Sequence, residues 1–182
     1  MPRIKPVTDA GATAGGIWST IDSLYDHRPE SNAALKKLGG AIAAEGTLSP
    51  RLLELVRLRV GFHNQCRTCM AVRYQTELVS DDLVCSLERP AEADELTEQE
   101  RGALRYADLL ATHHLAIDGA VYDSLREHFD EGQIVELGMF CAFSVGFGRL
   151  LATWKVTEHL PEWFQSDDGI VTPWGHPGCA AL

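Results

Sequence analysis

Two cysteines three residues apart, Cys66 and Cys69, are the residues of this chain whose types and spacing most directly predict chemistry. The thiolate is the reactive form of cysteine, and a helix start or a nearby cation lowers the pKa of the thiol. A second thiol three residues away can resolve a sulfenic acid or a mixed disulfide within the same chain. The pair therefore predicts peroxide reduction or disulfide exchange.

Three further side chains can join this pair: Glu54, His63 and Arg73. His63 precedes Cys66 by three residues, and Arg73 follows Cys69 by four, so on one continuous helix Arg73 and Cys69 share a face. If two helices form an antiparallel hairpin that turns near His63, Glu54 and Arg73 come out level with each other. One small region is thus expected to hold both cysteines, Glu54 and Arg73.

Each of these three side chains also has a simpler interpretation. Glu54 can be a solvated carboxylate that pairs with Arg57 or Arg51 along its own helix. Arg73 can be a structural ion-pair partner of Glu54. His63 can be a favourable cation at the end of its helix, or it can serve as a base from the turn.

A metal site is the main rival of redox chemistry for the cysteines. His63, Cys66 and Cys69 could supply three ligands, but zinc takes a fourth and no second cluster of ligands follows in the sequence. We expect no metal and no cofactor. Five cysteines without a framework spacing do not predict a secreted disulfide scaffold, and Cys85 and Cys141 are interpreted as small core residues.

Hydrophobic spacing, caps and breaks predict an all-α fold in which a helical hairpin carries the cysteine pair. Ser49 followed by Pro50 predicts a helix start, and Thr97 with Glu100 fits a capping box. The expected helices are Ile17–Tyr25, Ser31–Glu45, Pro50–Phe62, Cys66–Val79, Asp81–Leu87, Thr97–His113, Asp118–Phe129 and Glu131–Glu158.

The 182 residues predict one domain with two extensions. Residues 1–16 are expected to be a flexible segment, residues 17–159 the helical domain, and residues 160–182 an arm packed on the body or on a neighbouring subunit. The hydrophobic helix near Glu136–Trp154 is consistent with self-association.

Charge and hydropathy exclude several partners. With 26 acidic and 16 basic side chains the formal net charge is −10, so a polyanion is repelled and nucleic acid is not an expected partner. The uncharged apolar stretch Leu137–Gly148 is too short to span a bilayer, and we expect no secretory signal at the N-terminus. We expect no membrane association and a cytoplasmic location.

The arrangement of Glu54, Cys66 and Cys69 within RLRVGFHNQC resembles the carboxymuconolactone decarboxylase and alkyl hydroperoxidase D-like (AhpD-like) superfamily. The segments LTEQERGALRYADLL and HFDEGQIVELGMF also resemble the family's following helices, so the resemblance covers about Ser49–Glu158. It implies an all-α domain assembled as a trimer or hexamer, and a peroxidase activity that depends on the cysteine pair.

The same resemblance implies roles for individual residues. Cys69 would attack the peroxide, Cys66 would resolve the intermediate, and Glu54 would belong to a proton relay. A small hydroperoxide would be the substrate, and a dithiol, thioredoxin-type or lipoyl-type donor the reductant. This chain departs from the family pattern, because Arg73 stands where the family has histidine and Thr68 lies between the cysteines.

Two questions stay open from sequence. Arginine cannot accept a proton as imidazole does, so Arg73 could hold Cys69 as a thiolate but could not relay protons. A helix start favours Cys66 as the low-pKa thiol, whereas the family assigns attack to Cys69. The alternative functions are a carboxymuconolactone decarboxylase-like enzyme acting on a small lactone acid, and a non-enzymatic oligomer that senses redox state.

Overall fold

Helices make up all the regular structure in the part of the chain that the structure describes. The structure is a computed structural model, and it describes residues 2–8, 16–44, 46–166 and 169–175. The prediction of an all-α fold is confirmed. The elements are α1 (Gly16–Tyr25), α2 (Pro29–Ala44), α3 (Pro50–His63), α4 (Arg67–Ala71), α5 (Asp81–Ser86), the 3-10 turn η2 (Pro90–Glu92), α6 (Glu98–Thr112), the 3-10 turn η3 (His114–Ala116), α7 (Gly119–Arg126), α8 (Glu131–Trp154) and α9 (Glu162–Gln165).

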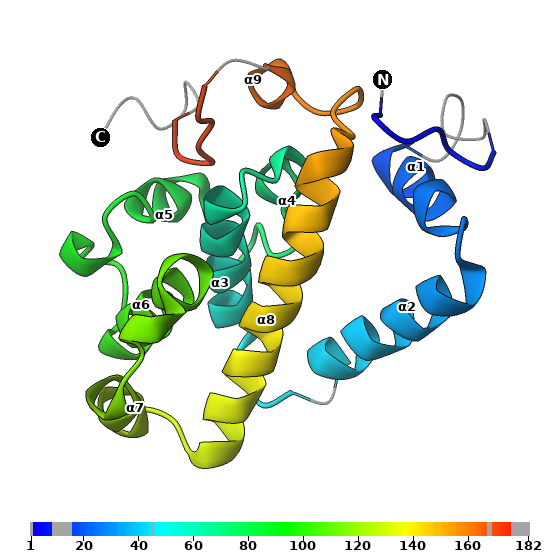
Figure 1. The fold of residues 1–182 in the computed structure, drawn as a ribbon. Coiled ribbons are helices and arrows are strands. Elements are labelled where there is room, and N and C mark those ends of the chain that lie inside the picture. Colours follow the sequence, from blue (N-terminus) through cyan, green and yellow to red (C-terminus); the bar gives the residue numbers. More distant parts are fainter. Residues whose placement is uncertain (1, 9–15, 45, 167–168, 176–182) are drawn as a thin grey trace.

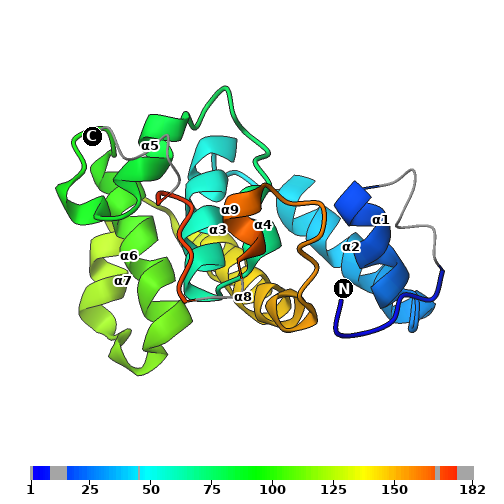
Figure 2. The ribbon, with the colours of Figure 1, turned by 90° about the horizontal axis from the view of Figure 1, so that it is seen from above.

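The helix α3 lies at the centre of the core. Its Leu55, Val56, Leu58 and Val60 are fully buried, and it packs against α6 and α8. In two perpendicular views, α1 and α2 lie on one side of α8, whereas α5, α6 and α7 lie on the other (Figures 1 and 2). The short helix α4 follows α3 directly and contacts α3, α8 and α9, so the cysteine pair lies where these helices meet.

Local capping explains why the helices begin where the sequence predicts. The Ser49 hydroxyl accepts a hydrogen bond from the backbone N–H of Leu52, and Pro50 occupies the first turn of α3. Thr97 and Glu100 form the predicted capping box at the start of α6. Both predicted helix starts are confirmed.

The predicted helix Cys66–Val79 is wrong. Its helical part, α4, ends at Ala71, and Val72 already has extended backbone. The chain then runs without regular structure to Ser80, which caps α5. The reason lies in side chains of α3 that bind this backbone.

The helix α8 has an apolar sequence on all sides but buries only part of it. Leu137 and Cys141 are fully buried, whereas Val135, Met139 and Leu150 are exposed. Its length and composition would allow it to cross a bilayer, a test that the core helices of soluble proteins also pass. The sequence prediction considered only the uncharged residues Leu137–Gly148, whereas the helix extends from Glu131 to Trp154. The argument that this segment is too short to span a bilayer therefore does not hold for the whole helix.

The two remaining cysteine predictions have different outcomes. Cys141 is a free and fully buried core cysteine, as predicted. Burial raises the pKa of its thiol to about 12, so it stays protonated. Cys85 packs against the core as predicted but is only partly buried, and it is disulfide-bonded instead of unpaired.

The described parts of both terminal segments pack on the body. Residues 2–8 are held by bonds such as the one from the Arg3 N–H to the carbonyl of Trp154. Residues 169–175 lie against the turn between α3 and α4, where Trp174 packs on Phe62 with ring centroids 4.5 Å apart. The predicted division into a domain with two extensions stays a prediction, and residues 1, 9–15, 167–168 and 176–182 of these extensions lie outside the described part of the chain.

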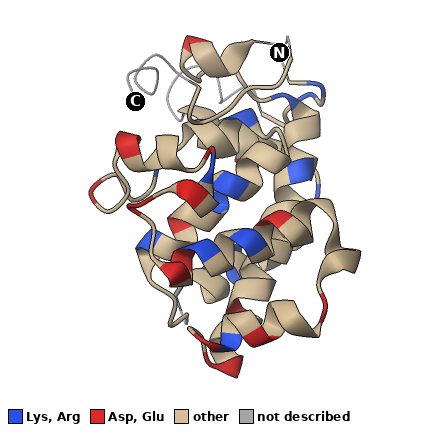
Figure 3. Ribbon diagram, turned by 90° about the vertical axis from the view of Figure 1, so that its left-hand side faces the viewer, with Lys and Arg blue, Asp and Glu red and all other residues tan. Residues whose placement is uncertain are grey.

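Ribbon segments of acidic and of basic residues lie among one another on the side of the molecule that Figure 3 shows. Arg51 of α3 and Glu100 of α6 are 2.6 Å apart, and Arg126 of α7 and Glu131 of α8 are 2.7 Å apart. Charges of opposite sign are therefore paired between these helices.

Candidate active site

The cysteine pair lies at the start of α4 and is joined as a disulfide. Cys66 and Cys69 have Sγ atoms 2.03 Å apart and Cα atoms 5.2 Å apart. Cys66 is the N-cap residue of α4, and its sulfur accepts the backbone N–H of Cys69 at 3.2 Å. The two thiols can therefore react with each other without a backbone rearrangement.

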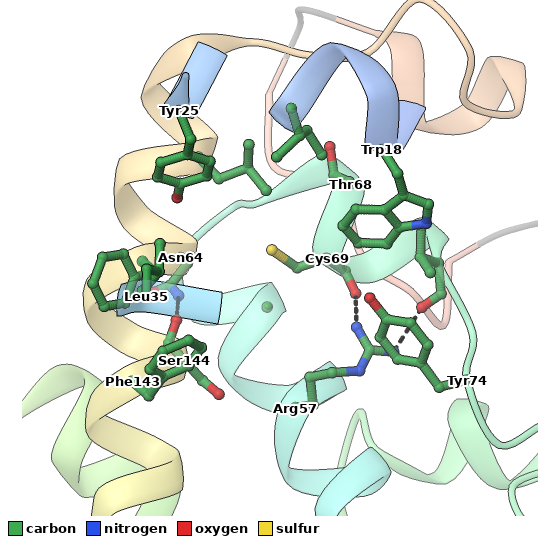
Figure 4. Close-up of a pocket in the computed structure, with 16 residues that line it drawn as sticks. Trp18, Tyr25, Leu35, Arg57, Asn64, Thr68, Cys69, Tyr74, Phe143 and Ser144 are labelled. Atoms are coloured by element: carbon green, nitrogen blue, oxygen red, sulfur yellow. Dashed lines mark hydrogen bonds between the residues drawn. The ribbon is translucent and has the colours of Figure 1, made fainter. Parts of the chain in front are cut away.

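The two cysteines differ in access. Cys66 is fully buried, whereas Cys69 is partly exposed and lines a cavity of about 250 Å³. Figure 4 shows the Cys69 sulfur directed into this cavity, between Asn64 on one side and Trp18 on the other. Helices α1, α2, α3 and α8 supply the other walls. A substrate in the cavity would reach Cys69 and not Cys66.

The polar side chains at the base of the cavity already have partners. The Asn64 amide donates to the carbonyl of Ser144 at 2.9 Å and accepts from Arg149 Nε at 3.1 Å. The Thr68 hydroxyl donates to the carbonyl of Val156 at 2.9 Å. These groups fix the turn that carries the cysteines and leave a largely apolar cavity.

A glycine allows α8 to approach this turn. A Cβ atom at Gly148 would lie 2.5 Å from Asn64 Nδ2 and 3.8 Å from Cys69 Sγ. The first distance is too short for any real contact, so a side chain there would push the asparagine away from α8.

Glu54 is buried and ionised. Its side chain is 2% exposed and is bound by Arg57, with Nε and Nη2 each 2.8 Å from a carboxylate oxygen. Burial by itself raises the pKa of this carboxyl, but Arg57, the backbone N–H of Tyr74 and Arg73 together lower it below 4.5. Glu54 is therefore a fixed anion, and its nearest partner is the arginine three residues further along its own helix.

Arg57 links this carboxylate to the cysteine helix. Its Nη1 donates to the carbonyl of Cys69, and its Nη2 donates to the carbonyl of Val72 at 2.6 Å. In a continuous helix these two carbonyls would accept the N–H groups of later residues. Because Arg57 takes both, and Glu54 takes the N–H of Tyr74 at 2.9 Å, the chain leaves the helical path after α4. This explains why the predicted helix to Val79 does not form.

Sequence analysis considered Arg57 only as a surface partner of Glu54 and missed its contact with the cysteine helix. The spacing of three residues between Glu54 and Arg57 was the available signal. Nothing in that spacing shows that the guanidinium also reaches the backbone of the following segment.

Arg73 approaches Glu54, as the hairpin argument predicted, but it does not share a helix face with Cys69. Its Nε is 3.9 Å from a Glu54 oxygen and buried, and among the described residues it has no hydrogen-bond partner. Its Nη atoms bind the Asp81 carboxylate at 2.9 Å and the carbonyl of Val79. The shared face required a helix through Arg73, and α4 ends before it.

His63 lies on the other side of α3. Its Nε2 is 2.6 Å from Asp108, which also binds Arg59 at 2.7 Å. Burial raises the pKa of Asp108, but the hydrogen bonds from His63 and Arg59 outweigh it and hold that pKa low. His63 does not line the cavity that Cys69 faces. No group of three or more potential metal ligands occurs in the described ranges, so His63 and the two cysteines do not form the alternative metal site there.

The fold and the motif agree with comparisons to known proteins. The model of the carboxymuconolactone decarboxylase family matches residues 29–109, which include the cysteine pair and Glu54. Over these residues the chain is similar to the carboxymuconolactone decarboxylase family, and its fold is similar to that of AhpD-like proteins. This confirms the resemblance drawn from sequence.

Two solved structures share the fold. One is the alkylhydroperoxidase AhpD core of an uncharacterised peroxidase-related protein from Ralstonia eutropha JMP134, with a TM-score of 0.64 and 21% identity over 90% of this chain and 94% of that chain. The other is a protein of unknown function from Agrobacterium tumefaciens named as a candidate antioxidant defence protein AhpD. It has a TM-score of 0.63 and 22% identity over 76% of this chain and 96% of that one.

Curated relatives of higher identity have no known activity. The uncharacterised proteins Rv2313c and MT2376 from two strains of Mycobacterium tuberculosis are each 34% identical over an alignment of 149 residues. The alignment covers 75% of this chain. The chain spans about half the length of these relatives, since the match covers 50% of each.

Proposed function

We propose that this protein is a CxxC-dependent thiol peroxidase of the AhpD type, which reduces an organic hydroperoxide and is recycled by a dithiol donor. The observation that carries this proposal is the pairing of a buried Cys66 with a Cys69 that opens into a cavity. The similarity to the carboxymuconolactone decarboxylase family and the peroxidase-related name of the Ralstonia protein support it.

The chemistry balances with these two thiols alone. The Cys69 thiolate attacks the outer oxygen of ROOH, forms a sulfenic acid and releases ROH as the O–O bond breaks. The Cys66 thiolate then attacks the Cys69 sulfur, forms the disulfide and releases water. Two thiols supply the two electrons that reduce the peroxide, and a dithiol donor returns them by thiol–disulfide exchange.

Access to the cavity and hydrogen bonding support different roles for the two cysteines. Cys69 is assigned the attack because it lines the cavity. Cys66 is assigned the resolving step, because the N–H that its sulfur accepts stabilises a thiolate that needs to meet only Cys69. The helix-start argument for Cys66 and the family assignment of Cys69 are compatible in this scheme.

The cavity also contains acids for the leaving alkoxide. Tyr25 and Tyr74 both line it, and burial raises the pKa of each phenol, so both stay protonated at neutral pH. A phenol can donate a proton to RO⁻ as the O–O bond breaks. In this proposal a tyrosine takes the part that the missing family histidine would play, and Glu54 serves as the anchor of Arg57 and not as a relay.

The test combines a thiol count with turnover. The reduced protein is treated with one equivalent of cumene hydroperoxide, and free thiols are counted under denaturing conditions before and after. Because Cys85 is also disulfide-bonded, the count is made in a Cys85→Ser background. Two thiols should be lost there, and turnover with dithiothreitol should disappear in Cys69→Ser and in Cys66→Ser. Cys141→Ala is the matched control, because Cys141 is a free buried thiol outside the cavity and its loss should leave turnover intact.

The same variants distinguish the alternatives. A decarboxylase or lactone-acting enzyme would keep its activity in Cys69→Ser, since a redox pair is superfluous to that chemistry. A redox sensor would lose two thiols to peroxide but show no turnover with any dithiol. If no thiols are lost from the wild-type protein, the peroxidase proposal is wrong.

Self-association and location complete the proposal. The exposed apolar side chains Leu38 on α2 and Val135 and Met139 on α8 border one groove, which a second copy of the chain could cover. We propose a homo-oligomer that buries this groove, in line with the trimer or hexamer that the sequence resemblance implies. We also propose action in the cytoplasm, where donors keep such a dithiol reduced.

A further inference from the structure

The wall of the cavity opposite the cysteine helix comes from α1. Trp18, Ile21 and Tyr25 of this helix line the cavity together with Cys69. All three precede residue 29, where the match to the family model begins. This wall therefore lies outside the residues that the family model matches.

The α1 wall is fixed to the active site by aromatic stacking. The Trp18 ring stacks on the Tyr74 ring with centroids 6.1 Å apart and an interplanar angle of 27°. The guanidinium carbon of Arg57 lies 4.7 Å from the centroid of that same tyrosine ring. Since Arg57 also holds the carbonyl of Cys69, the indole is connected to the cysteine helix through two ring contacts and one hydrogen bond. Figure 4 shows Trp18, Tyr74 and Arg57 in succession along one side of the cavity.

Further aromatic rings line the cavity beside its aliphatic side chains. Phe143 and Phe147 of α8 pack together with centroids 4.9 Å apart, and both line the cavity. Tyr25 is held by Trp154, with ring centroids 4.7 Å apart. A set of flat rings around one sulfur favours a compact apolar group, because such rings offer large contact areas and few hydrogen bonds.

The size of the cavity limits the occupant. Its volume of about 250 Å³ lies just below the range of cavities that hold drug-sized molecules, about 300–1,000 Å³. It can hold one ring with a short branched chain, whereas the extended tail of a lipid hydroperoxide would lie outside it. Hydrogen peroxide would touch none of the aromatic walls while reacting at Cys69.

We propose that α1 sets the substrate range of this enzyme, with Trp18 as the specificity-determining residue that selects a compact aryl or branched alkyl hydroperoxide over hydrogen peroxide. This inference rests on the proposed function, since it names the substrate class of the same site. Trp18 acts on binding of the organic group, and Cys69 carries the chemistry for every peroxide.

The test compares two tryptophans of similar exposure. Trp18 is 45% exposed and Trp163 is 41% exposed, but Trp163 does not line the cavity. The first readout is binding of 2-phenyl-2-propanol, the alcohol product of cumene hydroperoxide, to the disulfide form, followed by titration calorimetry. The second is the ratio of kcat/KM for cumene hydroperoxide to kcat/KM for hydrogen peroxide.

Trp18→Ala should weaken alcohol binding and lower the kcat/KM ratio, each about tenfold, which is typical for loss of one apolar contact in a pocket. Trp18→Phe should retain most of the alcohol affinity and of the kcat/KM ratio. Trp163→Ala should leave both the affinity and the ratio unchanged. The inference is overturned if wild-type protein does not bind the alcohol, or if Trp18→Ala keeps both readouts within about twofold of wild type. Binding to the disulfide form needs no turnover, so a protein that binds the alcohol through Trp18 but reduces no peroxide would refute the proposed function alone.

Discussion

Replacing Glu54 by glutamine would leave the guanidinium of Arg57 buried without its counter-charge. The two side chains are 2% and 15% exposed and meet through two hydrogen bonds of 2.8 Å. Removing one partner of a buried ion pair destabilises a protein by about 3–5 kcal/mol. The glutamine oxygen can still accept one of the two bonds, so we expect a loss near the lower end, about 3 kcal/mol.

The assay is urea unfolding of the oxidised protein, followed by circular dichroism. A loss of about 3 kcal/mol corresponds to a fall in Tm of about 10 °C for a domain of this size. The control is Asp22→Asn, which removes the partner of Lys36 in a pair of 2.9 Å whose side chains are 49% and 56% exposed. An exposed pair contributes less than about 1 kcal/mol, so the control should stay close to wild type.

A double variant separates the ion pair from the contact with the cysteine helix. Replacing Glu54 by leucine and Arg57 by methionine removes both charges. In a buried pair with no other contacts, the double variant would regain much of the stability that Glu54→Gln loses. Here the carbonyls of Cys69 and Val72 would still lose their donors, so the double variant should stay less stable than wild type by about 1–3 kcal/mol. Cys69 should also react more slowly with peroxide in it. If Glu54→Gln matches the control, or if the double variant regains full stability and rate, the assigned link between this pair and the cysteine helix is wrong.

Three other predictions address the surroundings of the site. Gly148→Ala should destabilise the protein in urea unfolding because its Cβ would collide with the asparagine amide at the end of α3, whereas Gly102→Ala, with no neighbour within 4 Å, should gain up to about 1 kcal/mol. His63→Gln should keep peroxide turnover within about threefold of wild type, because the imidazole does not line the cavity. It should lower the free energy of unfolding, because the hydrogen bond to Asp108 is altered. A complete loss of turnover would instead identify His63 as a catalytic base. The pKa of Glu54 is lower in the folded state than its ordinary 4.5, so the stability it contributes is complete above about pH 4.5 and is lost as the pH falls through the folded value. Unfolding free energies measured from pH 7 to pH 3 should fall less steeply in Glu54→Gln, and equal slopes would contradict this assignment.

The sequence predicted the helices whose ends are set by local chemistry. Ser49 with Pro50, Ser80, and Thr97 with Glu100 satisfy backbone groups within one turn, so their effect can be read without knowing the fold. The cysteine pair could be interpreted for the same reason, because three residues suffice to bring two sulfurs within a bond.

The predicted helix through Arg73 failed because its residues are good helix formers whose backbone partners are taken from another element. Arg57 and Glu54 bind the carbonyls and the N–H that the helix would have needed. Propensity is worth only fractions of a kcal/mol per residue, whereas charged hydrogen bonds to buried backbone are each worth about 1.5–3 kcal/mol. The tertiary contacts therefore decide the local conformation.

The sequence by itself determined an all-helical fold, the pairing of Cys66 with Cys69, and the placement of Glu54 close to Arg73. Only the tertiary structure decided that Cys69 opens to a cavity while Cys66 is buried, that His63 turns to Asp108, and that α1 closes the cavity with Trp18. The physical reason is the separation along the sequence of the residues that interact. Caps and thiol spacing depend on neighbours along the chain, but access to a sulfur depends on side chains that arrive from helices far apart in sequence.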